Sequence, residues 1–424
     1  MRTRIAALVI AILFVLPIAG RCVELNLNTP APTPLPSAPQ LSETALLDVP
    51  PISLNCASAI LVEPESGQIL FEMNADSPRA VASVTKLMTI LLTLEAIDSG
   101  RISLEQQVVI SKEAAGMGGS QVLLDVGETQ SVSILLKSMI VGSANDAAVA
   151  LAETLYGSEA LCAAKMNERA ESLGMTDTHF VNCTGLPAKG QHTTARDVAR
   201  MSIAVFSHSL YYGYSQIWLD EVDHGDGRMT QLTNTNKLIR LLDGCDGGKT
   251  GSTKEAGYCL SATAKRSGMR LIAVVLGAPS GAERFDAAKE MLNYGFANYR
   301  LYPIAQRGAK VRGELPIIGG ESDRLSLELG GDLTLLIQKG DEQNVLLTPS
   351  LPDAVETPVE QGAEIGSVRV EIGGKTIATL PILAAESVQG KGFQTAIRRL
   401  IRNWAVCELM LAQRRCPMDM SLPR

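Results

Sequence analysis

Apolar residues follow a strand-like pattern near both ends of the chain and a helical period in its middle. Two short apolar runs at 59–62 and 69–72, separated by a turn at Gly67, predict a pair of strands. The run 84–97 is strongly apolar, which predicts a largely buried helix. Helical patterns predict further helices at residues 134–141, 147–156, 166–173 and 194–207.

Strand patterns return after these helices. Residues 258–264 and 271–276 flank a turn at Lys265–Gly268, so they predict a hairpin. Strands at the start, helices in the middle and strands at the end predict an α/β (α+β) domain over residues 52–300. In this domain we expect an antiparallel sheet flanked by helices.

The pattern changes after Tyr302. Residues 325–329 and 368–372 alternate cleanly between apolar and polar side chains, and glycine pairs at 330–331 and 373–374 supply turns. No long helical pattern interrupts this part of the chain. Residues 301–388 are therefore predicted to form a small all-β C-terminal domain.

The last segment, residues 389–424, carries a different pattern. One helical face holds the apolar side chains of Phe393, Ile397, Leu400, Ile401 and Trp404, and basic side chains lie mostly off that stripe. A basic amphipathic helix with a tryptophan is typical of a membrane-surface anchor. The alternative is a helix that packs on its own domain.

The N-terminus has the features of an export signal. Arg2 and Arg4 precede an apolar stretch at 6–19, which is too short to span a membrane comfortably. We predict a signal peptide over residues 1–22 and a proline-rich linker over residues 23–51. The protein is then expected at the extracytoplasmic face of the cell membrane or in the cell wall.

Composition narrows the classes of function. The chain has 424 residues, a formal net charge of −7 and only 4% aromatic residues, which argues against a nucleic-acid partner. None of the 8 cysteines forms a Cys-x-x-Cys pair, so they are interpreted as small hydrophobic residues rather than metal ligands. We expect no metal and no cofactor.

The first candidate for chemistry is the Ser-x-x-Lys string at residues 83–86. Positions i and i+3 share a helix face, so the Lys86 amine is expected to reach the Ser83 hydroxyl. A serine becomes a strong nucleophile when a base takes its proton. A lysine in a dry pocket near other cations has a lowered pKa and can act as that base. Alone, the string is weak evidence, because about one or two occur by chance in a chain of this length.

A second polar element, Ser143-Ala144-Asn145, falls between two predicted helices. Ser143 is a candidate for passing a proton from the nucleophile to the leaving amine. Asn145 is a candidate for holding a substrate carbonyl or for orienting Lys86. Taken by itself, Ser143 is more commonly a cap for a helix that begins near Asp146.

The third element, Lys249-Thr250-Gly251, is the most distinctive and precedes the predicted hairpin. Lys249 and Thr250 are candidates for binding a substrate carboxylate, and Gly251 leaves room for a substrate chain beside the strand. The backbone N–H of Ser252 is a candidate for an oxyanion hole together with that of Ser83. The three elements in this order are far stronger evidence than any one of them.

The sequence lacks the motifs of three other kinds of site, namely a phosphate-binding loop, a zinc site and a nucleophile elbow. Residues 248–250 match the end of a phosphate-binding loop, but Asp243 stands where that loop needs glycine. The 4 histidines form no His-Glu-x-x-His zinc pattern, and no Gly-x-Ser-x-Gly nucleophile elbow occurs.

On these motifs the chain resembles the low-molecular-mass penicillin-binding proteins of the D-alanyl-D-alanine carboxypeptidase type. The resemblance extends to the stretches at 82–89, 143–148, 182–186, 193–197, 234–238 and 246–251. It implies a beta-lactamase/transpeptidase-like domain. Departures are small: Val81 stands where many relatives have proline, and Ser252 follows the third motif where other residues occur.

The resemblance also implies a reaction. Ser83 would attack the carbonyl between the two terminal D-alanines of a peptidoglycan stem peptide. Lys86 would be the base, and Ser143 the proton relay. Lys249 would bind the terminal carboxylate of the substrate, and beta-lactam antibiotics would acylate Ser83 as inhibitors.

Two alternatives stay open at this point. A beta-lactamase of class A needs a glutamate between the second and third motifs to activate water, and residues 179–184 contain none. Glu168 and Glu171 lie earlier, on a predicted helix. The other alternative is an inactive wall-binding module, although every catalytic side chain is present.

Overall fold

The computed structural model of the chain describes residues 41, 52–392, 397 and 401. The predicted signal peptide lies outside these residues, and so does the predicted linker apart from Leu41. Of the predicted tail helix, only residues 389–392, Ile397 and Ile401 are described. Both isoleucines are helical and exposed. Among the described residues, no helix combines the length and apolar character needed to cross a membrane.

The first domain is built on an antiparallel sheet with strand order β2-β1-β9-β8-β7. Its strands are β1 (Ser58–Val62), β2 (Ile69–Met73), β7 (Cys245–Thr253), β8 (Gly257–Arg266) and β9 (Met269–Ala278). The predicted strand pair and the predicted hairpin are both confirmed. The hairpin turns through Ser267 and Gly268, whose φ angles of 49° and 85° suit a two-residue turn.

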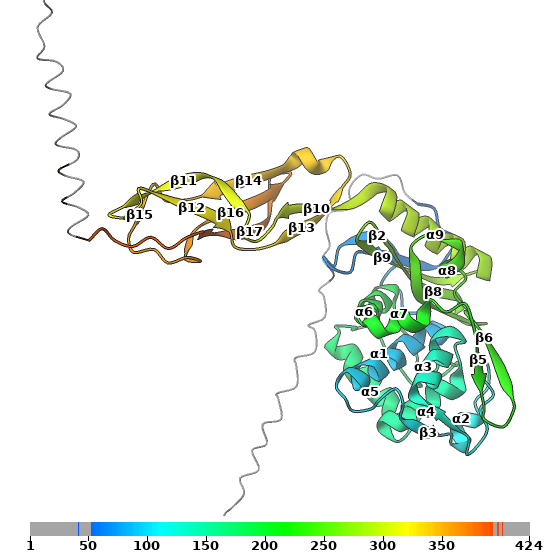
Figure 1. Cartoon of the computed structure of the whole chain (residues 1–424). Coiled ribbons are helices and arrows are strands. Elements are labelled where there is room, and N and C mark those ends of the chain that lie inside the picture. The colour runs from blue at the N-terminus through cyan, green and yellow to red at the C-terminus, as the bar shows by residue number, and fades with distance from the viewer. Residues whose placement is uncertain (1–40, 42–51, 393–396, 398–400, 402–424) are drawn as a thin grey trace, which may run out of the picture. The chain divides into compact units, whose positions relative to one another are not determined.

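Both faces of this sheet are buried, which explains the continuous apolar run of β9. Ile272, Val274 and Leu276 pack into the core that contains α1 (Lys86–Asp98) and α6 (Ala195–Phe206). The alternate residues, at 271, 273 and 275, pack into a second core with α9 (Gly281–Asn298). Figure 1 shows α9 on one side of the sheet and α6 on the other.

Most helices of this domain lie between β2 and β7 in the sequence, and one long helix follows β9. The longer ones in the domain are α1 (Lys86–Asp98), α3 (Val132–Val141), α4 (Asn145–Tyr156), α5 (Glu159–Ser172), α6 (Ala195–Phe206) and α9 (Gly281–Asn298). Four of them begin after a hydroxyl side chain that accepts a backbone N–H, namely Ser131, Ser158, Thr194 and Ser280. Local capping therefore fixes where these helices start.

Shorter elements complete the domain. The helices are α2 (Lys112–Ala115), α7 (Ser209–Ser215) and α8 (Leu238–Leu241). The strands form two separate pairs, β3 (Gln107–Val109) with β4 (Thr129–Ser131), and β5 (Leu219–Asp223) with β6 (Met229–Thr233).

The second domain is rich in strands, as the alternating pattern predicts. Its strands are β10 (Tyr299–Ala305), β11 (Lys310–Ile318), β12 (Arg324–Leu329), β13 (Leu333–Gln338), β14 (Val345–Ser350), β15 (Val355–Glu356), β16 (Glu364–Ile372) and β17 (Lys375–Ala384). Strands β10 and β13 pair with each other, and the others form one sheet in the order β14-β16-β17-β12-β11-β15. This domain has its own apolar core, which includes Leu325, Val368 and Ile382.

Candidate active site

The candidate nucleophile lies in a tight turn directly before the buried helix. Ser83 belongs to the 3-10 turn Ala82–Thr85, and Lys86 is the first residue of α1. The helix expected from residue 84 therefore begins two residues later. The Lys86 Nζ donates a hydrogen bond to the Ser83 Oγ at 2.9 Å, as the spacing predicts.

The Lys86 amine lies in a dry environment. Its side chain is fully buried, and its Nζ also donates to the Thr184 carbonyl at 2.7 Å. Burial lowers the pKa of Lys86 to about 7, although the nearby groups of Cys183, Asp146 and Glu159 oppose the shift. Much of this amine is consequently neutral at pH 7 and able to accept the Ser83 proton.

A second serine–lysine pair lies beside the first. Ser143 connects α3 to α4 with a positive φ of 63°, and its Oγ accepts a hydrogen bond from the Lys249 Nζ at 2.7 Å. Helix α4 begins at Asn145 after Ala144, and no side chain caps it. Ser143 is therefore not a helix cap, and its unusual backbone serves the contact with Lys249.

Asn145 joins α4 to the neighbouring loop. Its Nδ2 donates to the Gly118 carbonyl at 2.6 Å, and its backbone N–H donates to the Ser120 carbonyl at 2.7 Å. The Asn145 Oδ1 is buried and has no hydrogen-bond partner in the part of the chain that the structure describes. Over the same residues, Asn145 makes no hydrogen bond to Lys86. Of the two roles considered for Asn145, orienting Lys86 therefore has no hydrogen bond to support it, and its Nδ2 binds the loop instead.

Lys249 is the centre of positive charge at the site. It is fully buried on β7, and its Nζ also donates to the Thr250 carbonyl at 3.0 Å. Burial lowers the pKa of Lys249 well below its ordinary value, and the charges of Lys86 and Arg284 lower it further. An incoming carboxylate would relieve this penalty, because it supplies a counter-charge beside the Lys249 ammonium.

The rest of the third element lies along the same strand. The Thr250 Oγ1 donates to the Thr235 Oγ1 at 2.8 Å. A Cβ at Gly251 would lie 2.8 Å from the Ser83 backbone nitrogen, which real Cβ atoms do not tolerate. Glycine therefore allows β7 to pass directly beside the nucleophile. Ser252 follows it and is exposed.

Sequence reasoning missed the groups that hold this strand in place. Tyr211 is fully buried, and its hydroxyl donates to the Gly248 carbonyl and accepts from the Gly248 N–H, both at 3.0 Å. The Arg284 Nη1 donates to the Gly251 carbonyl at 3.2 Å. Thr184 lies in the stretch 182–186 that resembles the family, but the sequence does not indicate that its carbonyl accepts from Lys86. These contacts join residues that are distant in sequence, so no local pattern predicts them.

Comparison with known proteins gives the family. Residues 45–280, more than half of the chain, match the family described as D-alanyl-D-alanine carboxypeptidase. The chain belongs to this family. Residues 299–390 match a second family, described as the C-terminal domain of penicillin-binding protein 5. Membership of the carboxypeptidase family makes the protein a serine hydrolase.

Individual relatives agree with this assignment. The chain is 36% identical over 348 residues to the D-alanyl-D-alanine carboxypeptidase DacF of Bacillus subtilis, covering 82% of this chain and 89% of that protein. It is 33% identical to DacC of Escherichia coli over 350 residues, covering 80% and 86%. Penicillin-binding protein 5 of Haemophilus influenzae aligns in structure with a TM-score of 0.67 and 30% identity, covering 80% of this chain and 99% of that one.

Proposed function

We propose that this carboxypeptidase family member removes the terminal D-alanine from peptidoglycan stem pentapeptides through an acyl-enzyme on Ser83. The hydrogen bond of 2.9 Å between the Lys86 Nζ and the Ser83 Oγ carries the proposal. In the first step, Lys86 takes the hydroxyl proton and the Ser83 Oγ attacks the carbonyl carbon between the two D-alanines.

The negative charge that develops on the attacked oxygen needs donors. The Thr250 carbonyl accepts a hydrogen bond from the Lys249 Nζ, on the side of the strand that faces the site. Backbone groups two residues apart point to the same side of a strand, so the Ser252 N–H faces the same way. Together with the N–H of Ser83, against which Gly251 lies, it forms the proposed oxyanion hole.

Collapse of this intermediate breaks the peptide bond and releases D-alanine. The leaving nitrogen needs a proton, and Ser143 is proposed to relay to it the proton that Lys86 took from Ser83. Lys249 donates a hydrogen bond to the Ser143 Oγ and keeps its own charge. Lys249 and Thr250 are proposed to bind the carboxylate of the departing residue. Lys86, neutral again, then takes a proton from water, which attacks the carbonyl carbon of the acyl-enzyme ester. The bond to the Ser83 Oγ breaks, Ser83 regains its proton from Lys86, and the shortened peptide leaves with a new carboxyl end. A penicillin would form the same ester with Ser83.

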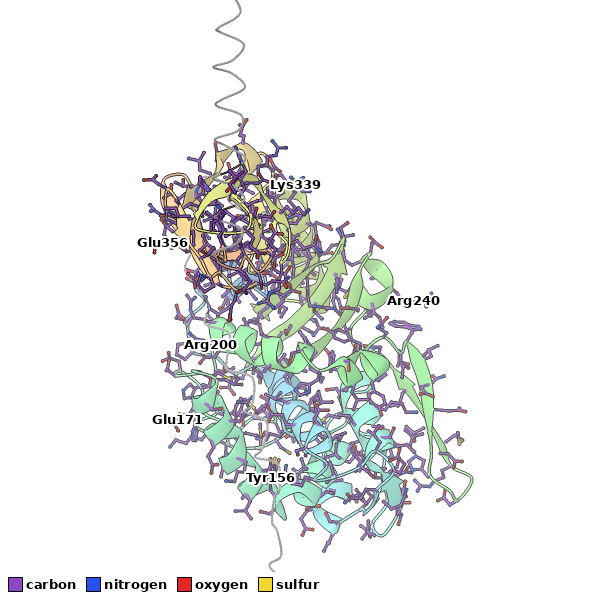
Figure 2. The ribbon with its side chains drawn as sticks, turned by 60° about the vertical axis from the view of Figure 1, so that its left-hand side comes forward. Tyr156, Glu171, Arg200, Arg240, Lys339 and Glu356 are labelled. Atoms are coloured by element: carbon purple, nitrogen blue, oxygen red, sulfur yellow. The ribbon has the colours of Figure 1, made fainter. Side chains whose placement is uncertain are left out.

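The glutamates of the described residues support a peptidase over a beta-lactamase. Glu168 and Glu171 lie on α5 and are exposed, and Figure 2 labels Glu171 at the helical part of the domain. Glu159 lies closer, but its carboxylate accepts the backbone N–H and the thiol of Cys183. Within the described range, no glutamate makes a hydrogen bond to Ser83.

We further propose that the protein acts outside the cytoplasm. Two arginines followed by an apolar stretch, within residues 1–22, support export. The basic amphipathic pattern of residues 389–424 supports attachment to a membrane surface. The domain boundaries at 52–300 and 301–388 follow the change of pattern after Tyr302. Removal of the tail should release the protein from membranes without loss of peptidase activity in solution.

The test combines two measurements. The protein is incubated with a pentapeptide that ends in D-Ala-D-Ala, and free D-alanine is followed over time. A fluorescent penicillin should label the wild type and the Ser99→Ala control, whose substitution lies at the far end of α1, but not Ser83→Ala. Label that persists on Ser83→Ala would show that the nucleophile is wrong. Rapid turnover of a chromogenic cephalosporin without D-alanine release would favour a beta-lactamase.

A further inference from the structure

A narrow groove beside the nucleophile has an anionic end that the proposed reaction does not use. Its lining includes residues 80–82, directly before Ser83, and residues 185–188 with Gln191. Thr253 and Glu255, from the end of β7 and the turn after it, also line it. The groove therefore joins the turn before the nucleophile to a carboxylate.

The order of residues along β7 gives the groove a direction. Lys249 comes first, Gly251 lies against Ser83, and Thr253 and Glu255 follow. Strand β7 is at the edge of its sheet, so a peptide can lie along its free side. If the terminal carboxylate of the substrate binds Lys249, the residues upstream of the cleaved bond pass Thr253, about 7 Å beyond Gly251 at the usual strand rise. The residue that precedes the two D-alanines then reaches Glu255.

The chemistry of that end favours a cation. Glu255 is exposed and makes no hydrogen bond or ion pair with any residue that the structure describes. Gln191 cannot replace it as an acceptor, because its Oε1 already accepts the backbone N–H groups of Val181 and Asn182. Two exposed lysines belong to the segments that line the groove: Lys254 precedes Glu255 directly, and Lys189 lies between the lining residues 188 and 191. Neither is paired with Glu255.

We propose that Glu255 binds the side-chain amine of the substrate residue immediately upstream of the two D-alanines. The inference rests on the proposed function, and it assigns to Glu255 the recognition of that amine. The groove would then match its substrate at both ends, with Lys249 for the terminal carboxylate and Glu255 for the upstream ammonium.

The test compares two peptides that differ only in that group. Nα-acetyl-L-Lys-D-Ala-D-Ala carries the amine, and the same peptide with norleucine has the same four side-chain carbons but lacks the amine. The wild type should show a kcat/KM about two- to fivefold higher for the lysine peptide, the range expected of a partly exposed ion pair. Glu255→Gln should lose this preference and keep its rate on the norleucine peptide. Lys254→Gln is the matched control and should retain the preference.

Two outcomes would overturn the inference, namely equal rates for both peptides in the wild type, or an undiminished preference in Glu255→Gln. A protein that labels with penicillin but releases D-alanine from neither peptide would refute the proposed function itself, and with it this inference. Added salt should reduce the preference of the wild type, because the ion pair is open to solvent.

Discussion

The pH dependence of acylation is the sharpest prediction from the buried lysine pair. Lys86 acts as a base only when it is neutral, so acylation should accelerate as the pH rises through its pKa of about 7. At that pKa the neutral fraction increases from about 10% at pH 6 to about 90% at pH 8. The acylation rate should therefore rise about tenfold over this interval and then level off.

An unperturbed lysine gives a different profile. With its ordinary pKa of 10.5, the neutral fraction would increase about tenfold for every pH unit from 6 to 9, with no plateau in that range.

The assay is stopped-flow acylation by a fluorescent penicillin at constant ionic strength. Circular dichroism at each pH serves as the control for folding. A rate that is flat from pH 5.5 to 9, or that rises without levelling, would refute the assignment of Lys86 as a base whose proton affinity is reduced by burial. The same profile should appear in kcat/KM for D-alanine release if acylation governs that parameter.

Two further predictions concern the parts that position the site. Gly185→Ala should reduce the rate of penicillin labelling at least about tenfold. Gly185 has a φ of 85°, and a Cβ at this position would overlap the Ala82 carbonyl oxygen beside the nucleophile. Labelling at the wild-type rate would contradict this prediction. Tyr211→Phe should cost about 1–3 kcal/mol, because both backbone groups of Gly248 lose their partner, and should lower kcat. Tyr212→Phe removes hydrogen bonds to the Phe206 carbonyl and to Thr263, both outside the site, and is the control in thermal melting and D-alanine release. Equal effects of the two variants would argue against a specific role of Tyr211 at the site.

Much of the fold could be predicted from periodicity because burial is periodic. The alternate residues of β9 enter two different cores, and this produces the apolar run that marks 271–276 as a buried strand. The strand pair β5 and β6 was not predicted. Its strands are short and mostly polar, with Val222 and Leu232 as their buried apolar residues, so they carry almost no hydrophobic signal.

The site divides in the same way. The contact between Ser83 and Lys86 is local, so helix geometry is enough to predict it. The contact between Ser143 and Lys249 joins residues 106 positions apart, and only the resemblance to a family placed them together. The orientation of Asn145 depends on the Gly118 carbonyl, which no sequence pattern locates. Side-chain orientation at the site is therefore fixed by tertiary contacts that sequence reasoning did not supply.

The close approach at Gly251 restricts how this enzyme could escape an antibiotic. Any side chain there would collide with the Val81 carbonyl and the Ser83 nitrogen, so a substitution that excludes a drug at this point would also displace the nucleophile. Ser252 is exposed and has room for a larger side chain. Variants selected under drug pressure should therefore accumulate at residue 252 while residue 251 remains glycine.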